Sequence, residues 1–314
     1  MGKGNHSGMS DFILLGFEEP PEHSIILFVC FLTMYLITLV ANSTMILIIS
    51  VDGQLQTPMY FFLRILSFVD ICLTTCTIPK LLVNIFAKRK TISFYGCFLQ
   101  IHFFISFGIM KDFLLAIMAV DRYLAISRPL HYVLLMNRRV CVALIAGSWI
   151  IVSGHAALNS VLTSQLSYCG SNEVHHYFCE LTQLFKASCS NTFMNEFLFV
   201  SEWPLFLFGP LLVIIISYIL IIITVVGMHS REGGRKAFST CSSHLFVVTI
   251  TYVPLLYTYI RPSSVDFIMK DLIMSVMFTI GCSMLNPFVY SIRNKDVKKA
   301  LIKALNKRTF SLKK

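Results

Sequence analysis

Seven long apolar stretches constrain the fold of this chain more than any other feature. A helix needs about 20 apolar residues to cross a hydrocarbon core of ~30 Å, whereas a strand of a membrane barrel needs only ~9–11 alternating residues. The stretches have helical length and are, in order, Ile25–Ile49, Pro58–Ile78, Phe98–Ala125, Val140–Val161, Phe197–Val226, Phe238–Ile260 and Leu272–Ile292. The sequence therefore predicts an all-α membrane protein, a bundle of seven transmembrane helices.

Composition supports this class. The chain is 56% hydrophobic and only 13% charged, whereas soluble proteins carry about 25% charged residues. Its first residues are too polar to form a cleaved signal peptide. The first apolar stretch is therefore expected to direct its own insertion into the membrane.

Basic residues predict the orientation, because cytoplasmic loops are enriched in Lys and Arg. With the N-terminus outside, sixteen basic residues fall on the inner side and eight on the outer side, although the run Lys88–Lys90 opposes the trend. The predicted parts are an extracellular segment (1–24), a membrane domain (25–292) and a cytoplasmic amphipathic helix and tail (293–314), in which Val297, Leu301, Ala304 and Leu305 share one face. The net charge of +10 then suits anionic membrane lipid and does not indicate nucleic-acid binding.

The outer side also carries a glycosylation acceptor and four cysteines. Asn5 begins an Asn-x-Ser sequence and is expected to be glycosylated. Disulfides form in this oxidising environment, and four cysteines allow three pairings, among which spacing does not choose. These cysteines are Cys97, Cys169, Cys179 and Cys189.

A metal site is not predicted. His175, His176, Cys179 and Glu180 lie close together in the chain. However, Cys179 is expected to be oxidised, and no second pair of ligands has zinc-like spacing.

Four motifs follow one another at the inner ends of the apolar stretches. They are LQTPMYFFLRILSFVDIC (Leu55–Cys72), MAVDRYLAISRPLHY (Met118–Tyr132), KAFSTCSSHL (Lys236–Leu245) and NPFVYSIRNKDVKKAL (Asn286–Leu301). Together they resemble the odorant receptors of the tetrapod type (class II), within the rhodopsin-like G protein-coupled receptors. The resemblance runs from Phe12 to about Leu305, and the order of the motifs makes it specific.

The resemblance implies a receptor that is not an enzyme and uses no cofactor. Its expected partners are a small, mostly apolar odorant bound within the bundle, and a stimulatory G protein of the olfactory type that raises cAMP. The expected location is the plasma membrane of olfactory cilia. The disulfides implied by the resemblance are Cys97–Cys179 and Cys169–Cys189.

The resemblance also assigns roles in activation. Asp121 restrains Arg122 in the resting receptor, and Arg122 is released to help receive the G protein, with Tyr123 and Tyr218 beside it. Asn42, Asp70, Asn286 and Tyr290 form a polar hub that rearranges, and Pro287 gives the last helix a point of bending. Alternatively, Arg122 marks the membrane boundary, and the polar residues only join helices.

Carrying over the family's pocket predicts eleven ligand-binding residues. They are Phe104, Ile105, Gly108, Ile109, Glu202, Phe206, Tyr252, Leu255, Tyr259, Val276 and Thr279. Glu202 is predicted to anchor a ligand that carries a donor or a positive charge; the alternative is a structural hydrogen bond to a neighbouring helix. The sequence departs from the family at Tyr252–Val253–Pro254, where a Tyr-Gly pair is usual, so the sixth helix is expected to bend differently.

Lys111 and Asp112 are the least expected residues, because charges inside a membrane helix are costly. Lys111 and Arg122 are eleven residues apart, about three helical turns, and so share a face. Related receptors commonly carry an acidic residue at the position of Lys111, where it helps to hold sodium. We therefore predict that the Lys111 ammonium replaces that cation and pairs with Asp70, unless burial keeps the lysine neutral. Asp112 is either a second partner or faces another helix.

Three other classes fit less well. A transporter is expected to show internal repeats, and a channel to show rings of charge or filter loops; neither pattern is evident. The sequence also lacks the HExxH, GxSxG and P-loop motifs that would suggest a membrane enzyme. A rhodopsin-like receptor for a ligand other than an odorant remains an alternative interpretation.

Overall fold

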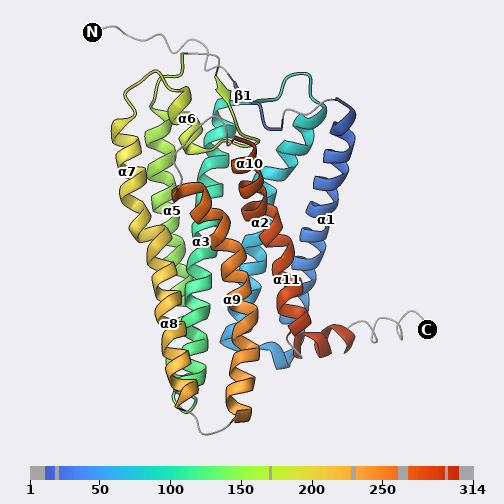
Figure 1. Ribbon diagram of the computed structural model, residues 1–314, viewed down its shortest axis with the longest axis vertical. Coiled ribbons are helices and arrows are strands. Elements are labelled where there is room, and N and C mark those ends of the chain that lie inside the picture. Colours follow the sequence, from blue (N-terminus) through green and yellow to red (C-terminus); the bar gives the residue numbers. More distant parts are fainter. Residues whose placement is uncertain are drawn as a thin grey trace, which may run out of the picture.

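Seven helical spans form one bundle, which Figure 1 shows from the side. The computed structural model describes residues 11–17, 21–169, 172–227, 231–260, 268–293 and 296–303. The first four spans are α1 (Pro21–Val51), α2 (Pro58–Phe86), α3 (Phe94–Ser127) and α5 (Arg138–Ser164). The fifth consists of α7 (Phe193–Trp203), η2 (Pro204–Phe208) and α8 (Gly209–Val226), the sixth is α9 (Arg231–Ile260), and the seventh consists of α10 (Ile268–Val276), η4 (Met277–Gly281) and α11 (Cys282–Arg293).

Length and composition make all seven spans able to cross a membrane. Large apolar side chains such as Ile25, Leu47, Ile150 and Ile222 are exposed on the outside of the bundle, where acyl chains would cover them. The seven-helix prediction is thus confirmed, and the chain is a multi-pass membrane protein.

Two predicted boundaries were wrong by several residues. The sixth span was predicted to begin at Phe238, but α9 begins at Arg231. The sequence prediction ended the second span at Ile78, but α2 continues through Pro79 to Phe86. Proline is tolerated inside membrane helices, because neighbouring helices and side chains satisfy the backbone groups that it frees. The extension carries Asn84 and Ile85 to the outer end of the bundle, beside the segment that contains β1 (Phe12–Leu14).

Two spans contain a π-helical segment at their centre. In the fifth span η2 begins at Pro204, and in the seventh η4 precedes α11. Such wide turns are rare and are often found at functional sites, because they rotate the side chains that follow. Both segments lie in the outer half of the bundle, where they contribute side chains to a cavity described below.

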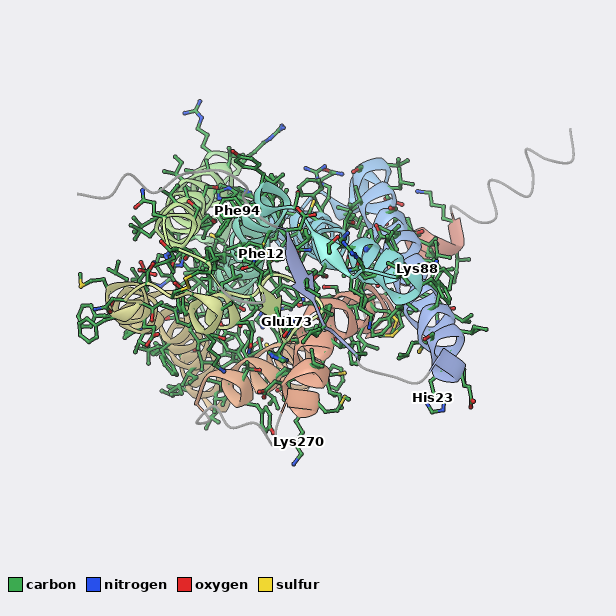
Figure 2. The ribbon with its side chains drawn as sticks, turned by 90° about the horizontal axis from the view of Figure 1, so that it is seen from above. Phe12, His23, Lys88, Phe94, Glu173 and Lys270 are labelled. Carbon is green, nitrogen blue, oxygen red and sulfur yellow. A yellow bond between two sulfur atoms is a disulfide. The ribbon has the colours of Figure 1, made fainter. Side chains whose placement is uncertain are left out.

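The outer end is covered by a small sheet and two disulfides. The strand order is β2 (Thr91–Ile92), β1, β3 (Glu173–Val174), with β1 antiparallel to β2 and parallel to β3. The Phe12 ring contacts the rings of Phe94 and Tyr168, and Figure 2 shows Phe12 and Glu173 near the centre of the bundle seen from above. Cys97 is bonded to Cys179 and Cys169 to Cys189.

The inner end has shorter elements. They are η1 (Gly53–Leu55), which follows α1, and α4 (Tyr132–Leu135), which follows α3. A further short helix, α6 (Leu181–Ala187), lies at the opposite, outer end. Residues 296–303 are helical and follow the seventh span, with Val297 buried and Lys303 paired to Asp52 at 3.3 Å. Leu301 is half-buried, and the predicted apolar positions Ala304 and Leu305 lie outside the described residues.

Candidate ligand-binding site

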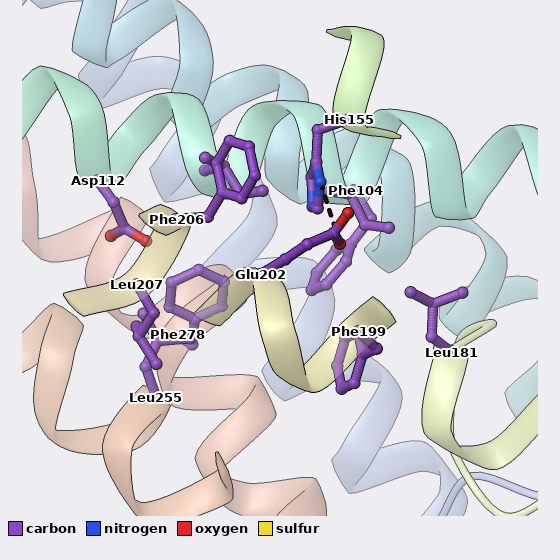
Figure 3. Close-up of a pocket in the computed structure, with 13 residues that line it drawn as sticks. Phe104, Asp112, His155, Leu181, Phe199, Glu202, Phe206, Leu207, Leu255 and Phe278 are labelled. Atoms are coloured by element: carbon purple, nitrogen blue, oxygen red, sulfur yellow. Dashed lines mark ion pairs between the residues drawn. The ribbon is translucent and has the colours of Figure 1, made fainter. Parts of the chain in front are cut away.

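A cavity of about 100 Å³ lies inside the outer half of the bundle. Figure 3 shows its lining, which is mostly apolar, with two carboxylates and one imidazole among the side chains. The residues that line it are Phe104, Ile105, Gly108, Ile109, Asp112, His155, Leu181, Phe199, Glu202, Phe206, Leu207, Leu255 and Phe278. Such a concave, apolar site with a few polar groups is typical of small-molecule binding.

Most of the residues predicted from the sequence line this cavity: Phe104, Ile105, Gly108, Ile109, Glu202, Phe206 and Leu255. Three others lie elsewhere. Tyr252 packs in the main core, Thr279 bonds to the Tyr177 hydroxyl at 3.0 Å, and Val276 packs against a cluster below the outer loop. The side chain of Tyr259 lies outside the described residues.

Six residues that line the cavity were not predicted from the sequence: Asp112, His155, Leu181, Phe199, Leu207 and Phe278. His155 and Asn159 are polar residues at helical spacing in an apolar span, a signal that could have indicated them. The π-helical turns give no comparable sequence pattern. Since η2 contributes Leu207 and η4 contributes Phe278, a regular α-helical wheel misplaces these two side chains.

Glu202 is already bonded to the neighbouring span. Its Oε2 accepts a hydrogen bond from Asn159 Nδ2 at 3.0 Å and lies 3.2 Å from His155 Nδ1, both on α5. The His155 ring stacks on Phe206 with 4.0 Å between centroids. Glu202 therefore joins two helices, as the structural interpretation proposed, and it also lines the cavity, where its predicted role as a ligand anchor stays a prediction.

Asp112 has a different environment from Glu202. Its side chain is 4% exposed and lines the inner part of the cavity, one helical turn below Gly108. Its Oδ1 has no hydrogen-bond partner among the residues that the structure describes. Figure 3 shows its carboxyl group directed towards the side of the cavity that Leu207 lines.

A polar hub lies below the cavity. The Lys111 ammonium is 2.9 Å from Asp70 Oδ1, and both side chains are fully buried. Ser283 Oγ donates to Asp70 Oδ1 at 2.8 Å and Asn286 Nδ2 to Asp70 Oδ2 at 2.7 Å. Asn42 Nδ2 joins the hub through the Ser283 carbonyl oxygen at 3.0 Å. The direct Lys111–Asp70 contact that we predicted is therefore present in the structure.

At the inner end of α3, Asp121 is bonded to a loop residue. The Tyr132 hydroxyl donates to Asp121 Oδ1 at 2.7 Å, and no ion pair joins Asp121 to Arg122 in the described part of the chain. Arg122 is buried, and neither its Nε nor its Nη1 has a partner among these residues. The local ion pair that we predicted between Asp121 and Arg122 is therefore absent from the described part of the chain, where Asp121 is bonded to Tyr132 of α4.

The remaining predicted activation residues lie near Arg122 or along the seventh span. The Tyr218 hydroxyl is hydrogen-bonded to His244 Nδ1 at 2.8 Å, and His244 Nε2 is 3.1 Å from the Leu115 carbonyl oxygen. His244 thereby ties α9 to α8 and α3, although the sequence analysis had assigned it no role. Tyr123 is half-buried, Tyr290 is buried in the core, and Pro287 lies inside α11.

The outer loop forms a lid over the cavity. The Phe178 ring lies 4.5 Å from the Phe104 ring, and His176 Nε2 is 3.2 Å from Ser275 Oγ. Burial lowers the pKa of His176 to about 3, so its imidazole is neutral at physiological pH. Gln100 secures the loop from below, since its Oε1 accepts from the Cys179 amide at 2.9 Å.

Comparisons with known proteins match this architecture. The family model for "Olfactory receptor" matches residues 30–308. Human olfactory receptor 1L1 is 48% identical over 98% of this chain and 85% of its own length, and mouse olfactory receptor 1E16 is 44% identical over 98% of both chains. Squid rhodopsin has the same fold, with a TM-score of 0.69 and 18% identity over 91% of this chain and 82% of its own. The chain therefore belongs to the olfactory receptor family and has the fold of a G protein-coupled receptor.

Proposed function

We propose that this receptor binds a small, mostly apolar volatile molecule in the cavity between α3, the fifth span and the sixth and seventh spans. The cavity carries this proposal. Its wall is mainly aromatic and aliphatic, with few polar groups, and Phe178 of the lid packs on Phe104 of the wall. A volatile compound has little polar surface, so burial of apolar area would supply most of its binding free energy.

A second cavity of about 180 Å³ adjoins the first and shares Phe104, Leu255 and Phe278 with it. Its outer wall is formed by loop residues, including His176 and Phe178. We propose that a ligand enters through this space and then passes Phe104. The lid would have to move only locally, because Cys179 is held by a disulfide and by Gln100.

We further propose that ligand binding activates a stimulatory G protein of the olfactory type and so raises cAMP. The groups to be rearranged are the Asp121–Tyr132 and Tyr218–His244 contacts, which close the inner end around buried Arg122. Breaking them would free Arg122 to contact the G protein. Basic residues of this inner surface, such as Lys298 and Lys303, would meet anionic lipid.

The expected placement in the cell follows from the same proposal. Residues 1–24 would be extracellular, with Asn5, which lies outside the described residues, glycosylated. Residues 25–292 would form the receptor domain and residues 293–314 the cytoplasmic helix and tail. The protein would reside in the plasma membrane of olfactory cilia.

The test is cAMP accumulation in transfected cells exposed to a panel of volatile compounds. We expect a dose-dependent response that Arg122→Ala abolishes while surface expression, measured by antibody labelling of intact cells, stays at the wild-type level. Arg128→Ala, an exposed arginine in the next turn of the same region, is the matched control. Ligand-dependent solute or ion flux without any cAMP response would contradict the proposal.

A further inference from the structure

Among the buried carboxyl groups of the described spans, Asp112 has an oxygen without a hydrogen-bond partner. Asp70 is paired with Lys111 and bonded by Ser283 and Asn286, and Asp121 accepts from Tyr132. Asp112 is equally buried, yet its Oδ1 has no partner among the described residues. The Lys111 ammonium is not available to it as a close partner, since that group lies within 2.9 Å of Asp70 and 3.3 Å of Ser283 Oγ.

Asp112 is therefore the carboxyl group of the cavity whose hydrogen bonds are incomplete. Lys111 pairs with Asp70, and Glu202 is bonded to Asn159 and lies within 3.2 Å of His155. Asp112 is left over, and it lines the cavity. A buried carboxylate without a partner is costly, and a cation or strong donor brought by a ligand would remove that cost. The bond to an ionised group is also about twice as strong as a neutral hydrogen bond.

The size of the cavity limits the ligand. Its volume is about 100 Å³, and an apolar protein cavity of about 150 Å³ holds a molecule as large as benzene. The cavity walls include Gly108, Leu207, Leu255 and Phe278, which offer apolar contact. A short aliphatic chain with one donor group fits both the volume and the wall.

We propose that the cavity selects small primary aliphatic amines, with the ammonium bonded to Asp112 and the chain packed against Leu207, Leu255 and Phe278. The proposal rests on the cavity being the ligand site of this receptor. It assigns the anchoring role to Asp112, and it gives Glu202 the task of joining α5 to the fifth span.

The test compares n-butylamine with 1-butanol, which has the same chain and a neutral donor. Purified receptor in detergent is heated with increasing concentrations of each compound, and the shift in Tm gives the affinity without any need for signalling. We expect n-butylamine to bind about tenfold more tightly or better, which corresponds to about 1.4 kcal/mol. Asp112→Asn should remove this preference, because it should lower the affinity for n-butylamine far more than the affinity for 1-butanol.

Glu202→Gln is the matched control, because it makes the same acid-to-amide change in the same cavity, and it should keep the preference for the amine. If Asp112→Asn fails to fold, Asp112→Ser is measured in the same way. The proposal is overturned if wild-type receptor binds n-butylamine no better than 1-butanol, if Asp112→Asn keeps the preference, or if Glu202→Gln alone removes it.

The cAMP assay separates this inference from the proposed function. Amine binding by Tm shift without any cAMP response would support the amine site and contradict the proposed coupling. A cAMP response to neutral volatiles, with no response to or binding of amines, would support the receptor function and overturn the amine site.

Discussion

Lys111 and Asp112 are neighbours on α3, both are buried, and their surroundings differ completely. Lys111 enters a hub in which Asp70 also accepts hydrogen bonds from Ser283 and Asn286, whereas Asp112 presents an unpartnered oxygen beside a cavity. Successive residues of a helix point about 100° apart, so adjacent positions reach separate environments. The protein satisfies one charge internally, and we propose that it leaves the other for a ligand.

The largest effect is expected from breaking the hub. Lys111→Met leaves Asp70 as a buried carboxylate without its cation, and the loss of one partner of a buried pair costs about 3–5 kcal/mol. We expect a large fall in Tm and in surface expression, measured on purified receptor and on intact cells.

The control is the double variant Asp70→Asn/Lys111→Met, which removes both charges. It should recover most of the lost stability, because no uncompensated charge remains. A double variant as unstable as Lys111→Met would show that the pair is not the main interaction of Lys111.

A second pair of neighbours, His175 and His176, extends the comparison to the lid. His175 is exposed and His176 is buried with its pKa lowered to about 3. An unfolded histidine has a pKa of about 6.5, so the unfolded chain takes up the proton first as the pH falls. The contribution of neutral His176 to the free energy of unfolding is complete above about pH 6.5 and declines as the pH falls towards about 3. At pH 5 roughly 2 kcal/mol of that free energy has been lost.

We therefore expect Tm to fall between pH 7.5 and pH 5 in the wild type and to fall less in His176→Gln. His175→Gln should behave like the wild type. An equal acid sensitivity in all three proteins would place the responsible group elsewhere.

Substitutions of Gly108, which lines the cavity one helical turn above Asp112, should have a smaller effect, and this effect is on ligand affinity. A Cβ at Gly108 would lie 3.7 Å from Phe278 Cζ, which is ordinary contact. Gly108→Ala should therefore change ligand affinity little. The two further methyl groups of Gly108→Val would enter the cavity or displace Phe278, and we expect about a tenfold loss of affinity, or ~1.4 kcal/mol, in the Tm-shift titration.

Asp112→Asn should change stability in the opposite direction from Lys111→Met. Removing a buried carboxyl group that lacks a partner relieves a desolvation cost. In the absence of ligand we therefore expect the free energy of unfolding to stay level or to rise by about 1 kcal/mol at most, and Tm to follow it. A marked fall would mean that Asp112 already has a stabilising partner in the resting receptor.

Sodium should have the smallest effect of all. The Lys111 ammonium lies where it can pair with Asp70 directly, so we expect Tm and cAMP responses to be the same in sodium and in choline chloride. Lys111→Glu should make the receptor sensitive to sodium. Sodium dependence in the wild type would contradict the role of Lys111 as a built-in cation.

Sequence patterns predicted the helices well because a membrane span has a defined length and composition. The Lys111–Asp70 contact was also predicted. The three helical turns between Lys111 and Arg122 indicated its face, and the resemblance to receptors that hold sodium at this position indicated Asp70 as its partner. The side chains of Leu207 and Phe278 could not be placed from the sequence, because the π-helical turns that begin at Pro204 and Met277 rotate them away from the α-helical pattern. Asp112 could be recognised as unusual from sequence, but the absence of a partner is a property of the packed helices around it.

The outer sheet has a consequence for synthesis of the chain. Its central strand, β1, pairs Ile13 with Glu173 and Leu14 with Val174, so some of the first residues to be made need partners that are made much later. Contacts between such distant parts of a chain form slowly. We therefore expect the spans to insert and assemble before the sheet closes, so that an N-terminal fusion altering Phe12–Leu14 would delay maturation of the lid while leaving helix insertion intact.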